Sequence, residues 1–318
     1  MCTIQLLLPF YGESRDINTL KYNLSQIVPI NFKWLIACQE KDFLKIKKII
    51  SNIKSDSIDI ITSKKNLLVS NARNFLIDYS SSDFVSFIDS DDVIDTSSFS
   101  QIHNYIQNNK ENFYIAPYEK NHNLRGLIDC AYLITNYLSN PYGTHLIHHV
   151  WSKFFSLAFL KKNKIYFDEK ISIYEDMDFI SKVITNLEKV NIMPFYFYKH
   201  NKSSGTLGKK IYGAPLAFIG SIESYSLYLN KKSISNSSSM KKYSFAYFFH
   251  KSNILLSRNI FYFHFYSLFL MLHNKEIFNS LKNNPSKKYG NIPKILFYDP
   301  TRIFSSIFYL ILSRKSIL

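Results

Sequence analysis

The chain has 318 residues, of which 46% are hydrophobic and 16% aromatic, so it can fill a sizeable core and does not have the composition of a disordered protein. A formal net charge of +15 suits an anionic partner, namely nucleic acid, an anionic membrane surface or a phosphorylated substrate. Cys2, Cys38 and Cys130 form no CxxC pair, which argues against a disulfide framework and a cysteine metal site and favours a reducing compartment.

The first 90 residues alternate between short apolar runs and segments with apolar residues at helical spacing. The start, MCTIQLLLPF, lacks the basic residues of a signal peptide, and we expect none. Strands are expected at 3–10, 32–38, 57–63 and 84–89, with helices at 16–27, 42–53 and 69–79. Strands alternating with helices predict βαβ units in an α/β fold with a mostly parallel sheet. Such sheets bind ligands at the carboxyl ends of their strands.

Beyond residue 110 the pattern is less regular. We expect a strand within 112–120, a loop that enters a helix over 148–169, and a strand within 190–206. An acidic trio within 171–187 is expected just ahead of a helix, where carboxylates favour the positive end of the helix dipole. From about residue 207 the chain reads as helical, aromatic and basic.

Charge divides the chain into two regions. Residues 1–206 hold 23 Lys and Arg against 21 Asp and Glu, whereas residues 207–318 hold 16 against 3. The most apolar stretch, residues 259–274, is shorter than the roughly 20 residues of a membrane span. This stretch and the tail 301–318 suit either helices lying on an anionic membrane or an aromatic helical pair packed on the main domain. We expect a main domain over 1–206 and a helical region over 207–318 for membrane contact, acceptor contact or oligomerisation.

Four aspartates follow the fourth expected strand in the sequence FVSFIDSDDVID: Asp89, Asp91, Asp92 and Asp95. Carboxylates this close raise one another's pKa unless a cation lies between them. A calcium loop of the EF-hand type does not fit, because the fifth and sixth positions counted from Asp89 are Val93 and Ile94 instead of an oxygen ligand and a glycine.

Three interpretations of these aspartates remain from the residues alone. Asp95 precedes a helical pattern and suits an N-cap, but capping does not explain Asp89 and Asp91 at the end of an apolar strand. The letters DSDDV also fit the first motif of a haloacid-dehalogenase-type phosphatase, with Asp89 as nucleophile and Asp91 as acid, although that motif normally opens its domain. The third interpretation is a Mg²⁺ or Mn²⁺ site that joins Asp89 and Asp91 to the phosphates of a nucleotide.

The segment SNARNFLIDYSSSDFVSFIDSDDVID resembles the signature of family 2 glycosyltransferases with the GT-A fold. That signature is an Ala-Arg-Asn helix start, then a strand, then a DxD metal motif. Four further segments match the family in the same order: LLLPFY, HVWSKFF, IYEDMDFISKV and FYFYKHNKSSGT. The resemblance covers roughly residues 3–206. It implies an inverting, metal-dependent transfer of a sugar from a nucleotide-sugar to a hydroxyl of a glycan or lipid-linked acceptor. The expected base of the nucleotide is uracil.

The resemblance also implies roles for individual residues. Asp176 would be the catalytic base, and Asp89 and Asp91 would hold Mn²⁺ or Mg²⁺. The donor-binding residues would be Pro9, Tyr11, Glu40, Arg73, Asp89, Ser90, Lys153 and His200. The acceptor contacts would be Trp151, Glu175 and His149. The second expected strand ends in Gln39 and Glu40 where the family usually has two aspartates, and Glu40 is the candidate replacement.

The low Gly and Pro content and the abundant Ile, Lys, Asn and Ser are typical of an AT-rich bacterial genome. We therefore expect a role in a bacterial surface polysaccharide such as lipopolysaccharide or capsule, for an enzyme that is cytoplasmic and peripheral on the inner membrane. The non-enzymatic alternative is a basic nucleic-acid-binding protein, since the aromatic, basic residues 207–318 could stack on bases and contact phosphates. No recognised nucleic-acid motif is present, so nucleic acid is not the expected partner.

Overall fold

The computed structural model describes residues 2–10, 17–51, 53, 57–117, 124–137, 144–171, 175–200, 221, 224–225, 227–229 and 231–234. The strands are β1 (Ile4–Pro9), β2 (Phe32–Gln39), β3 (Ile58–Ser63), β4 (Phe84–Phe87), β5 (Val93–Ile94), β6 (Phe113–Ile115), β7 (Gly126–Asp129), β8 (Lys153–Ser156), β9 (Lys189–Ile192) and β10 (Tyr198–Lys199). The helices are α1 (Ile17–Ser25), α2 (Phe43–Ile50), α3 (Val69–Tyr79), α4 (Phe99–Asn109), α5 (Cys130–Tyr137), α6 (Thr144–His148), α7 (Leu157–Lys162) and α8 (Glu175–Thr185), with short 3₁₀ turns η1 (Glu40–Asp42) and η2 (Thr96–Ser98).

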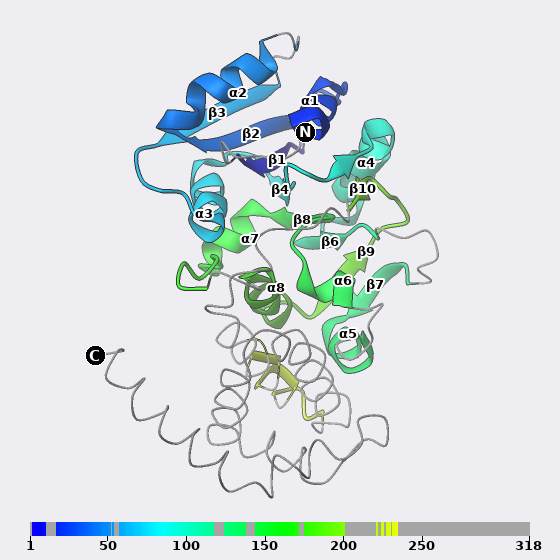
Figure 1. Ribbon diagram of the computed structural model, residues 1–318. Helices are drawn as coiled ribbons and strands as arrows, with labels where there is room; N and C mark the ends of the chain where they lie inside the picture. Colours follow the sequence, from blue (N-terminus) through cyan, green and yellow to red (C-terminus); the bar gives the residue numbers. More distant parts are fainter. Residues whose placement is uncertain are drawn as a thin grey trace, which may run out of the picture.

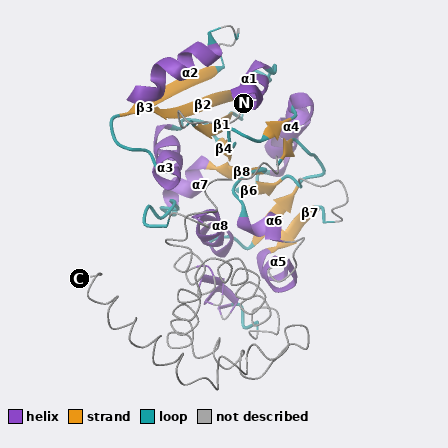
Figure 2. Ribbon diagram, in the orientation of Figure 1, coloured by secondary structure: helices purple, strands orange, loops and turns teal. Residues whose placement is uncertain are grey.

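The centre of the fold is an eight-stranded sheet in the order β3-β2-β1-β4-β8-β6-β9-β7 (Figures 1 and 2). The four strands from β3 to β4 are all parallel, as the alternating pattern of the first 90 residues predicts. The other half is mixed: β8 runs antiparallel to β4 and β6, β6 is parallel to β9, and β7 is antiparallel to β9. The predicted α/β class with a mostly parallel central sheet is confirmed.

Both faces of the sheet are apolar because helices cover both (Figure 1). In β1, Leu7 joins the core cluster that contains α3, α5, α7 and α8. Its neighbours Leu6 and Leu8 join the opposite cluster, with α1, α2 and α4. Successive side chains of a strand point to opposite faces, so a strand buried on both sides reads as the unbroken apolar run that LLL shows.

Three predicted elements differ from the structure. The loop predicted ahead of the helix in 148–169 instead contains strand β8, whose four residues are all buried and continue directly into α7. The acidic trio lies within the first turn of α8, not ahead of it. The strand predicted within 190–206 is two short strands, and the second, β10, pairs with β5 in a separate two-stranded sheet. The strand differences depend on pairing with distant residues, which a local apolar pattern does not contain.

A described segment near residue 230 packs against the main sheet domain. Tyr225 and Leu229 are fully buried in the cluster that contains α5 and α8. The Tyr228 hydroxyl donates to the Leu187 carbonyl at 2.8 Å. The two apolar stretches 259–274 and 301–318 lie outside the described residues, so the membrane role and the division at residue 206 stay predictions. Within the described part of the chain, no helix has both the length and the apolar character needed to cross a bilayer.

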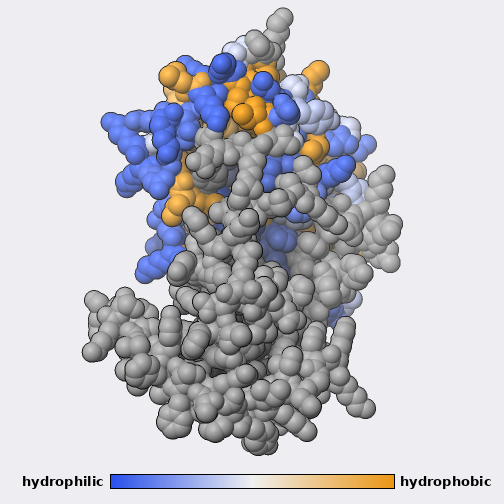
Figure 3. All heavy atoms as spheres, viewed as in Figure 1, coloured by the Kyte–Doolittle hydropathy of each residue, from blue (hydrophilic) through white to orange (hydrophobic). Residues whose placement is uncertain are grey.

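The coloured surface in Figure 3 is largely hydrophilic, with hydrophobic areas set among the polar side chains. Among the described residues, Ile27 and Ile30 are the most exposed large apolar side chains, at 92% and 90%. Both belong to the loop between α1 and β2. Apolar residues exposed singly in this way are normal for a folded protein and need no partner.

Candidate functional site

The predicted donor-site residues lie at the carboxyl end of the parallel strands. Pro9 is the last residue of β1, Glu40 follows β2 in η1, and Asp89 lies two residues beyond β4. Because β1, β2 and β4 are parallel, these residues share one edge of the sheet. Glu40 is exposed there, and Pro9 is buried. Tyr11, also predicted to bind the donor, lies outside the described residues.

The aspartate-rich segment forms a turn after β4. The Asp92 amide donates to the Asp89 carbonyl at 3.2 Å, so residues 89–92 close a tight turn that carries Ser90 and Asp91 at its tip. Asp95, beyond the turn, accepts a hydrogen bond from the Ser97 amide at 2.9 Å. This contact confirms its predicted role as a cap, at the short helix η2. The four aspartates therefore do not act as a single group.

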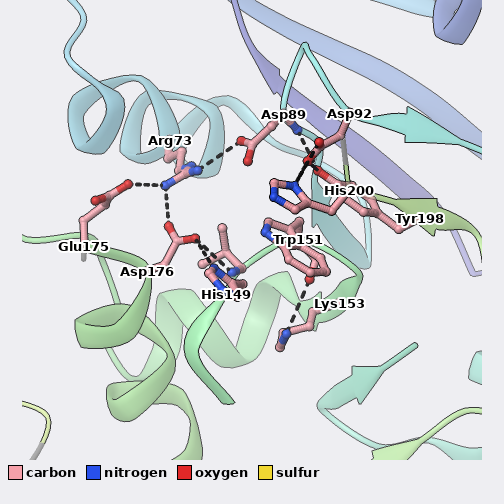
Figure 4. Close-up of polar contacts among 11 residues, drawn as sticks. Arg73, Asp89, Asp92, His149, Trp151, Lys153, Glu175, Asp176, Tyr198 and His200 are labelled. Atoms are coloured by element: carbon pink, nitrogen blue, oxygen red, sulfur yellow. Dashed lines mark hydrogen bonds and ion pairs between the residues drawn. The ribbon is translucent and has the colours of Figure 1, made fainter. Parts of the chain in front are cut away.

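Arg73 joins three carboxylates that come from distant parts of the chain (Figure 4). Its Nη1 donates to Asp176 Oδ1 at 2.6 Å and to Glu175 Oε1 at 2.9 Å, and its Nη2 donates to Asp89 Oδ1 at 3.1 Å. The arginine side chain is only 4% exposed, and its guanidinium lies 5.3 Å from the centre of the Phe167 ring. The fixed fork of a guanidinium suits this shared binding, which a lysine cannot reproduce. Arg73 thus connects the Ala-Arg-Asn helix, the DxD turn and the first turn of α8.

The single positive charge of Arg73 does not fully offset the negative charge of the carboxylates around it. Burial raises the pKa of Asp89 to about 6; Arg73 opposes this shift, while Asp176, Asp92 and Asp91 add to it. Burial and the charge of Asp176 also raise the pKa of Glu175. The Asp89 side chain is nevertheless 32% exposed, so it can meet a ligand from solvent. The turn therefore has an excess of negative charge that an added cation would relieve.

Asp176 is held at both carboxylate oxygens. Arg73 binds Oδ1, and the Val150 amide donates to Oδ2 at 3.2 Å. His149 Nδ1 lies 4.0 Å from the same oxygen, and the His149 side chain is 40% exposed. The third acid of the trio, Asp178, instead pairs with Lys182 one helical turn later, at 2.6 Å. The structure thus separates Asp176, which faces the site, from Asp178, which serves the helix.

Aromatic rings stack beside Asp176 (Figure 4). The Trp151 indole lies parallel to the His149 ring at 5.0 Å and to the Tyr198 and His200 rings at 5.1 and 5.5 Å. Trp151 is 4% exposed, so most of its surface is covered by the protein. His149 and His200 are the more exposed members of the stack, with 40% and 44% of their side chains accessible. Contact between Trp151 and an acceptor stays a prediction.

The chain turns sharply between Trp151 and Lys153. Ser152 has a positive backbone φ of 59°, which residues other than glycine rarely adopt. Two hydrogen bonds with Ala116 hold it: Ser152 Oγ donates to the Ala116 carbonyl at 2.7 Å, and the Ala116 amide donates to the Ser152 carbonyl at 2.9 Å. Before this turn, Trp151 forms an isolated parallel β-bridge with Phe87 of β4, and after it Lys153 begins β8. Sequence reasoning did not identify Ser152.

Lys153 is buried, with 1% exposure, and Nζ donates to the Trp151 carbonyl at 3.4 Å. Burial lowers the pKa of Lys153 to about 7, and the charge of Asp176 partly opposes that shift. A phosphate or sugar contact at Lys153 remains a prediction, because the side chain lies beneath Trp151 and not at the surface.

Asp92, which sequence reasoning left without a role, is the most buried of the four aspartates, at 1% exposure. Its Oδ2 accepts from the Tyr198 hydroxyl at 2.6 Å, and its Oδ1 lies 3.1 Å from His200 Nδ1. The hydrogen bond to Asp92 raises the pKa of His200, although burial opposes the shift. No local pattern reveals these contacts, because Tyr198 and His200 follow more than 100 residues later.

The turn is chemically suited to a divalent cation. Within the described residues, no cluster of three or more His, Cys, Asp and Glu has the arrangement of a complete metal site. Mg²⁺ and Mn²⁺ do not require one, since Mg²⁺ is often bound through one or two carboxylates plus substrate phosphates and water. Asp89 and Asp91 offer such hard oxygen ligands, and burial, with Asp176, Asp92 and Asp91 adding to it, raises the pKa of Asp89. The residues therefore fit the predicted metal.

Part of the chain is similar in sequence to known glycosyl transferases. Residues 44–159, from α2 into α7, match the sequence model of glycosyl transferase family 2. The minor teichoic acid biosynthesis protein GgaB of Bacillus subtilis (strain 168) is 25% identical over 142 residues, which are 42% of this chain and 15% of that protein. The chain therefore spans a small part of this curated relative.

Solved structures show the same fold. The crystal structure of S. aureus TarS residues 1–349 in complex with UDP-GlcNAc aligns with a TM-score of 0.54 and 19% identity, over 76% of this chain and 69% of that one. A longer TarS structure aligns with a TM-score of 0.61 and 15% identity, over 96% of this chain and 54% of that one. The GT-A-like fold implied by the sequence motifs is confirmed, and residues 44–159 of the chain are similar to glycosyl transferase family 2.

Proposed function

We propose that this protein is an inverting, metal-dependent glycosyltransferase that moves a sugar from a UDP-linked donor to a hydroxyl of a cell-wall polymer of the teichoic acid type. The family match supports glycosyl transfer, and the relationship to GgaB supports the cell-wall polymer. A UDP-linked donor is supported by TarS, which was crystallised with UDP-GlcNAc and with UDP. The proposal replaces lipopolysaccharide or capsule with a teichoic acid as the favoured surface polymer.

The contact of Arg73 with two separate carboxylate groups carries the proposal. A sugar hydroxyl is a poor nucleophile at neutral pH, so a base must accept its proton as the new bond forms. In an inverting reaction that base lies on the opposite face of the sugar from the departing diphosphate, so it cannot be a metal-binding aspartate. Arg73 brings Asp176 beside the DxD turn while Asp176 stays on a different element, α8. Two carboxylate groups of distinct role are thereby held at one site.

The chain's own residues divide the work of this reaction. Asp176 accepts the hydroxyl proton, and Arg73 with the Val150 amide fixes its orientation. His149, partly exposed beside Asp176, would meet the acceptor. Asp89 and Asp91 would hold Mn²⁺ or Mg²⁺, which supplies positive charge to the diphosphate as it leaves.

The phosphatase hypothesis has less support. Its motif normally opens a domain, whereas here β4 is preceded by β1, β2 and β3, and it pairs directly with β1 in the same sheet.

The first experiment screens nucleotide-sugars for slow donor hydrolysis and for transfer to purified teichoic acid polymers, with and without Mn²⁺. We expect metal-dependent turnover of a UDP-sugar and a label in the polymer. Failure of every donor to turn over would refute the proposal. Accumulation of an acyl-phosphate on Asp89 would instead support the phosphatase.

The second experiment tests the base by Asp176→Asn, which keeps the shape of the side chain. Transfer should fall by about 10²-fold or more, the usual contribution of a general base, while binding of UDP with Mn²⁺ persists. Asp178→Asn is the matched control, because Asp178 belongs to the same helical turn but pairs with Lys182. Near-normal transfer by Asp176→Asn would exclude it as the base and direct attention to Glu175.

A further inference from the structure

Asp92 differs from the other aspartates of the turn in what its carboxylate contacts. It is 1% exposed, and the Tyr198 hydroxyl and His200 Nδ1 occupy its two oxygens, at 2.6 and 3.1 Å. With 1% of the residue exposed and a protein donor at each oxygen, this carboxylate has little surface to offer an ion from solvent. Burial of a carboxylate is costly unless such donors compensate it. The contacts therefore suit a structural task better than a metal-binding one.

Tyr198 carries the effect of Asp92 to the metal-binding turn. Its hydroxyl donates to Asp92 Oδ2 and accepts from the backbone amide of Asp89 at 3.3 Å. The Asp89 amide, the tyrosine hydroxyl and the Asp92 carboxylate thus form one chain of hydrogen bonds. The hydroxyl proton is committed to Asp92, which leaves the oxygen lone pairs to face the Asp89 amide. The orientation of Tyr198 therefore depends on Asp92.

A second element holds the same turn from the other side. Asn23 of α1, which is fully buried, donates from Nδ2 to the Asp92 carbonyl at 2.6 Å. Its Oδ1 accepts from the Ile94 amide at 3.1 Å. The backbone on both sides of residue 93 is thereby fixed to α1, while Tyr198 fixes the start of the turn to β10. Asp92 is the residue that both sets of contacts share.

We propose that Asp92 is a positioning residue: acting through Tyr198, its carboxylate fixes the backbone of the turn that presents Asp89 and Asp91. The expected effect of Asp92 on metal affinity rests on the proposed function, whereas its effect on the backbone of the turn does not. Partners that orient metal ligands without touching the metal commonly affect affinity strongly, since a mobile ligand must be ordered when the ion binds. This task explains why a third carboxylate belongs to a turn where it adds to the repulsion on Asp89.

The test uses two isosteric substitutions in the full chain, Tyr198→Phe and Asp92→Asn. Tyr198→Phe removes the hydroxyl that joins the Asp89 amide to Asp92. Tyr166→Phe is the matched control, because it removes another tyrosine hydroxyl that donates to an aspartate. The Tyr166 hydroxyl donates to Asp78 Oδ1 at 2.9 Å, and Asp78 lies on α3, away from the turn. Mass-spectrometric hydrogen exchange without metal or nucleotide measures the peptide covering residues 88–94.

We expect faster exchange in that peptide for Tyr198→Phe and Asp92→Asn, with unchanged exchange in β1 and no effect of Tyr166→Phe on the turn. Calorimetry with Mn²⁺ and UDP, well below the melting temperature, should show affinity reduced by about 10- to 100-fold in each variant. In the double variant the loss should be close to that of one substitution, because both remove the same link.

Two results would overturn the inference: unchanged exchange of residues 88–94 in Tyr198→Phe, or affinity losses that multiply in the double variant. The second would mean that Asp92 acts independently of Tyr198, for instance as a metal ligand. If the wild-type protein binds no UDP with Mn²⁺, the proposed function fails, and the exchange measurement still decides whether Asp92 positions the turn.

Discussion

Replacing Arg73 with methionine would test the connection on which the site depends. Methionine keeps much of the volume and the apolar contact with Phe167 but removes the cation shared by Asp89, Glu175 and Asp176. The three carboxylates would then face one another without a counter-charge. We therefore expect loss of both stability and donor binding, in a pattern that depends on pH.

The size of the stability loss follows from the burial of the contacts. The three nitrogen–oxygen distances lie between 2.6 and 3.1 Å, and the Arg73, Glu175 and Asp176 side chains are at most 15% exposed. Removing one partner of a buried ion pair costs about 3–5 kcal/mol, chiefly because the other charge stays buried. One cation serves all three carboxylates, so the losses do not add and this range applies to the cluster. At about 2–4 °C per kcal/mol, the melting temperature should fall by about 6–20 °C.

The loss should shrink as the pH falls. Burial already raises the folded-state pKa of Asp89 to about 6 and raises that of Glu175, and Arg73 opposes both shifts. Without Arg73 these pKa values rise further above their unfolded values. A carboxyl group with a raised folded pKa destabilises the fold above its unfolded pKa, and protonation relieves that cost as the pH falls through the folded value. The gap in melting temperature between wild type and Arg73→Met should therefore be smaller at about pH 5.5 than at about pH 8.

Thermal melting followed by circular dichroism, without metal or nucleotide, measures this gap. Arg125→Met is the matched control, because Arg125 lies just ahead of β7, donates to the Tyr196 hydroxyl at 2.8 Å and stacks on the Tyr196 ring. The control should show a smaller loss with no comparable pH dependence. A gap for Arg73→Met that stays constant or widens toward acid would refute the reasoning.

Three further predictions follow from the charges. Affinity for UDP with Mn²⁺ should weaken about tenfold per pH unit below about pH 6, because protons compete with the metal for Asp89, whose pKa is raised to about 6. Equal affinity at pH 7 and pH 5 would argue against Asp89 as a metal ligand. Lys153→Met should stabilise the fold more at about pH 6 than at about pH 9. Burying the charged Lys153 destabilises the fold fully below its folded-state pKa of about 7, and this destabilisation fades as the pH rises toward the unfolded-state pKa. Melting temperatures at both pH values measure the gain, and an equal gain at both would contradict the prediction. Residues 207–318, with 16 basic residues against 3 acidic ones, should bind anionic liposomes in co-sedimentation, less as salt rises, and no binding at low salt would leave a packing or oligomer role.

The sequence predicted the parallel half of the fold because its signals there are local. The helix expected at 69–79 has those bounds, and the strands expected near 3–10, 32–38 and 57–63 differ by one or two residues at their ends. Apolar runs bounded by polar turns are sufficient for strands that helices bury on both faces. Strand β8 escaped prediction because its four residues run into α7 without a turn residue between them.

The site was predictable where carboxylates gather at the ends of elements. Asp89 and Asp91 stood out at a strand end, and the resemblance to the glycosyltransferase family selected Asp176 from the acidic trio. The structure brings Asp89 and Asp176 to the same guanidinium. The metal and base roles themselves remain predictions. Asp92 could not be distinguished from its neighbours by sequence, because burial and two partners more than 100 residues away set it apart.

The charge at the site supplies the physical reason for a metal. Five carboxylates meet around the turn and the start of α8: Asp89, Asp91, Asp92, Glu175 and Asp176. Against them the described contacts set the Arg73 guanidinium, His200 beside Asp92, and His149 at 4.0 Å from Asp176. A nucleotide diphosphate brings further negative charge, so direct binding would place like charges together. In a protein whose net charge is +15, this local excess of acid is best explained if a divalent cation lies between the carboxylates and the diphosphate, where it attracts both.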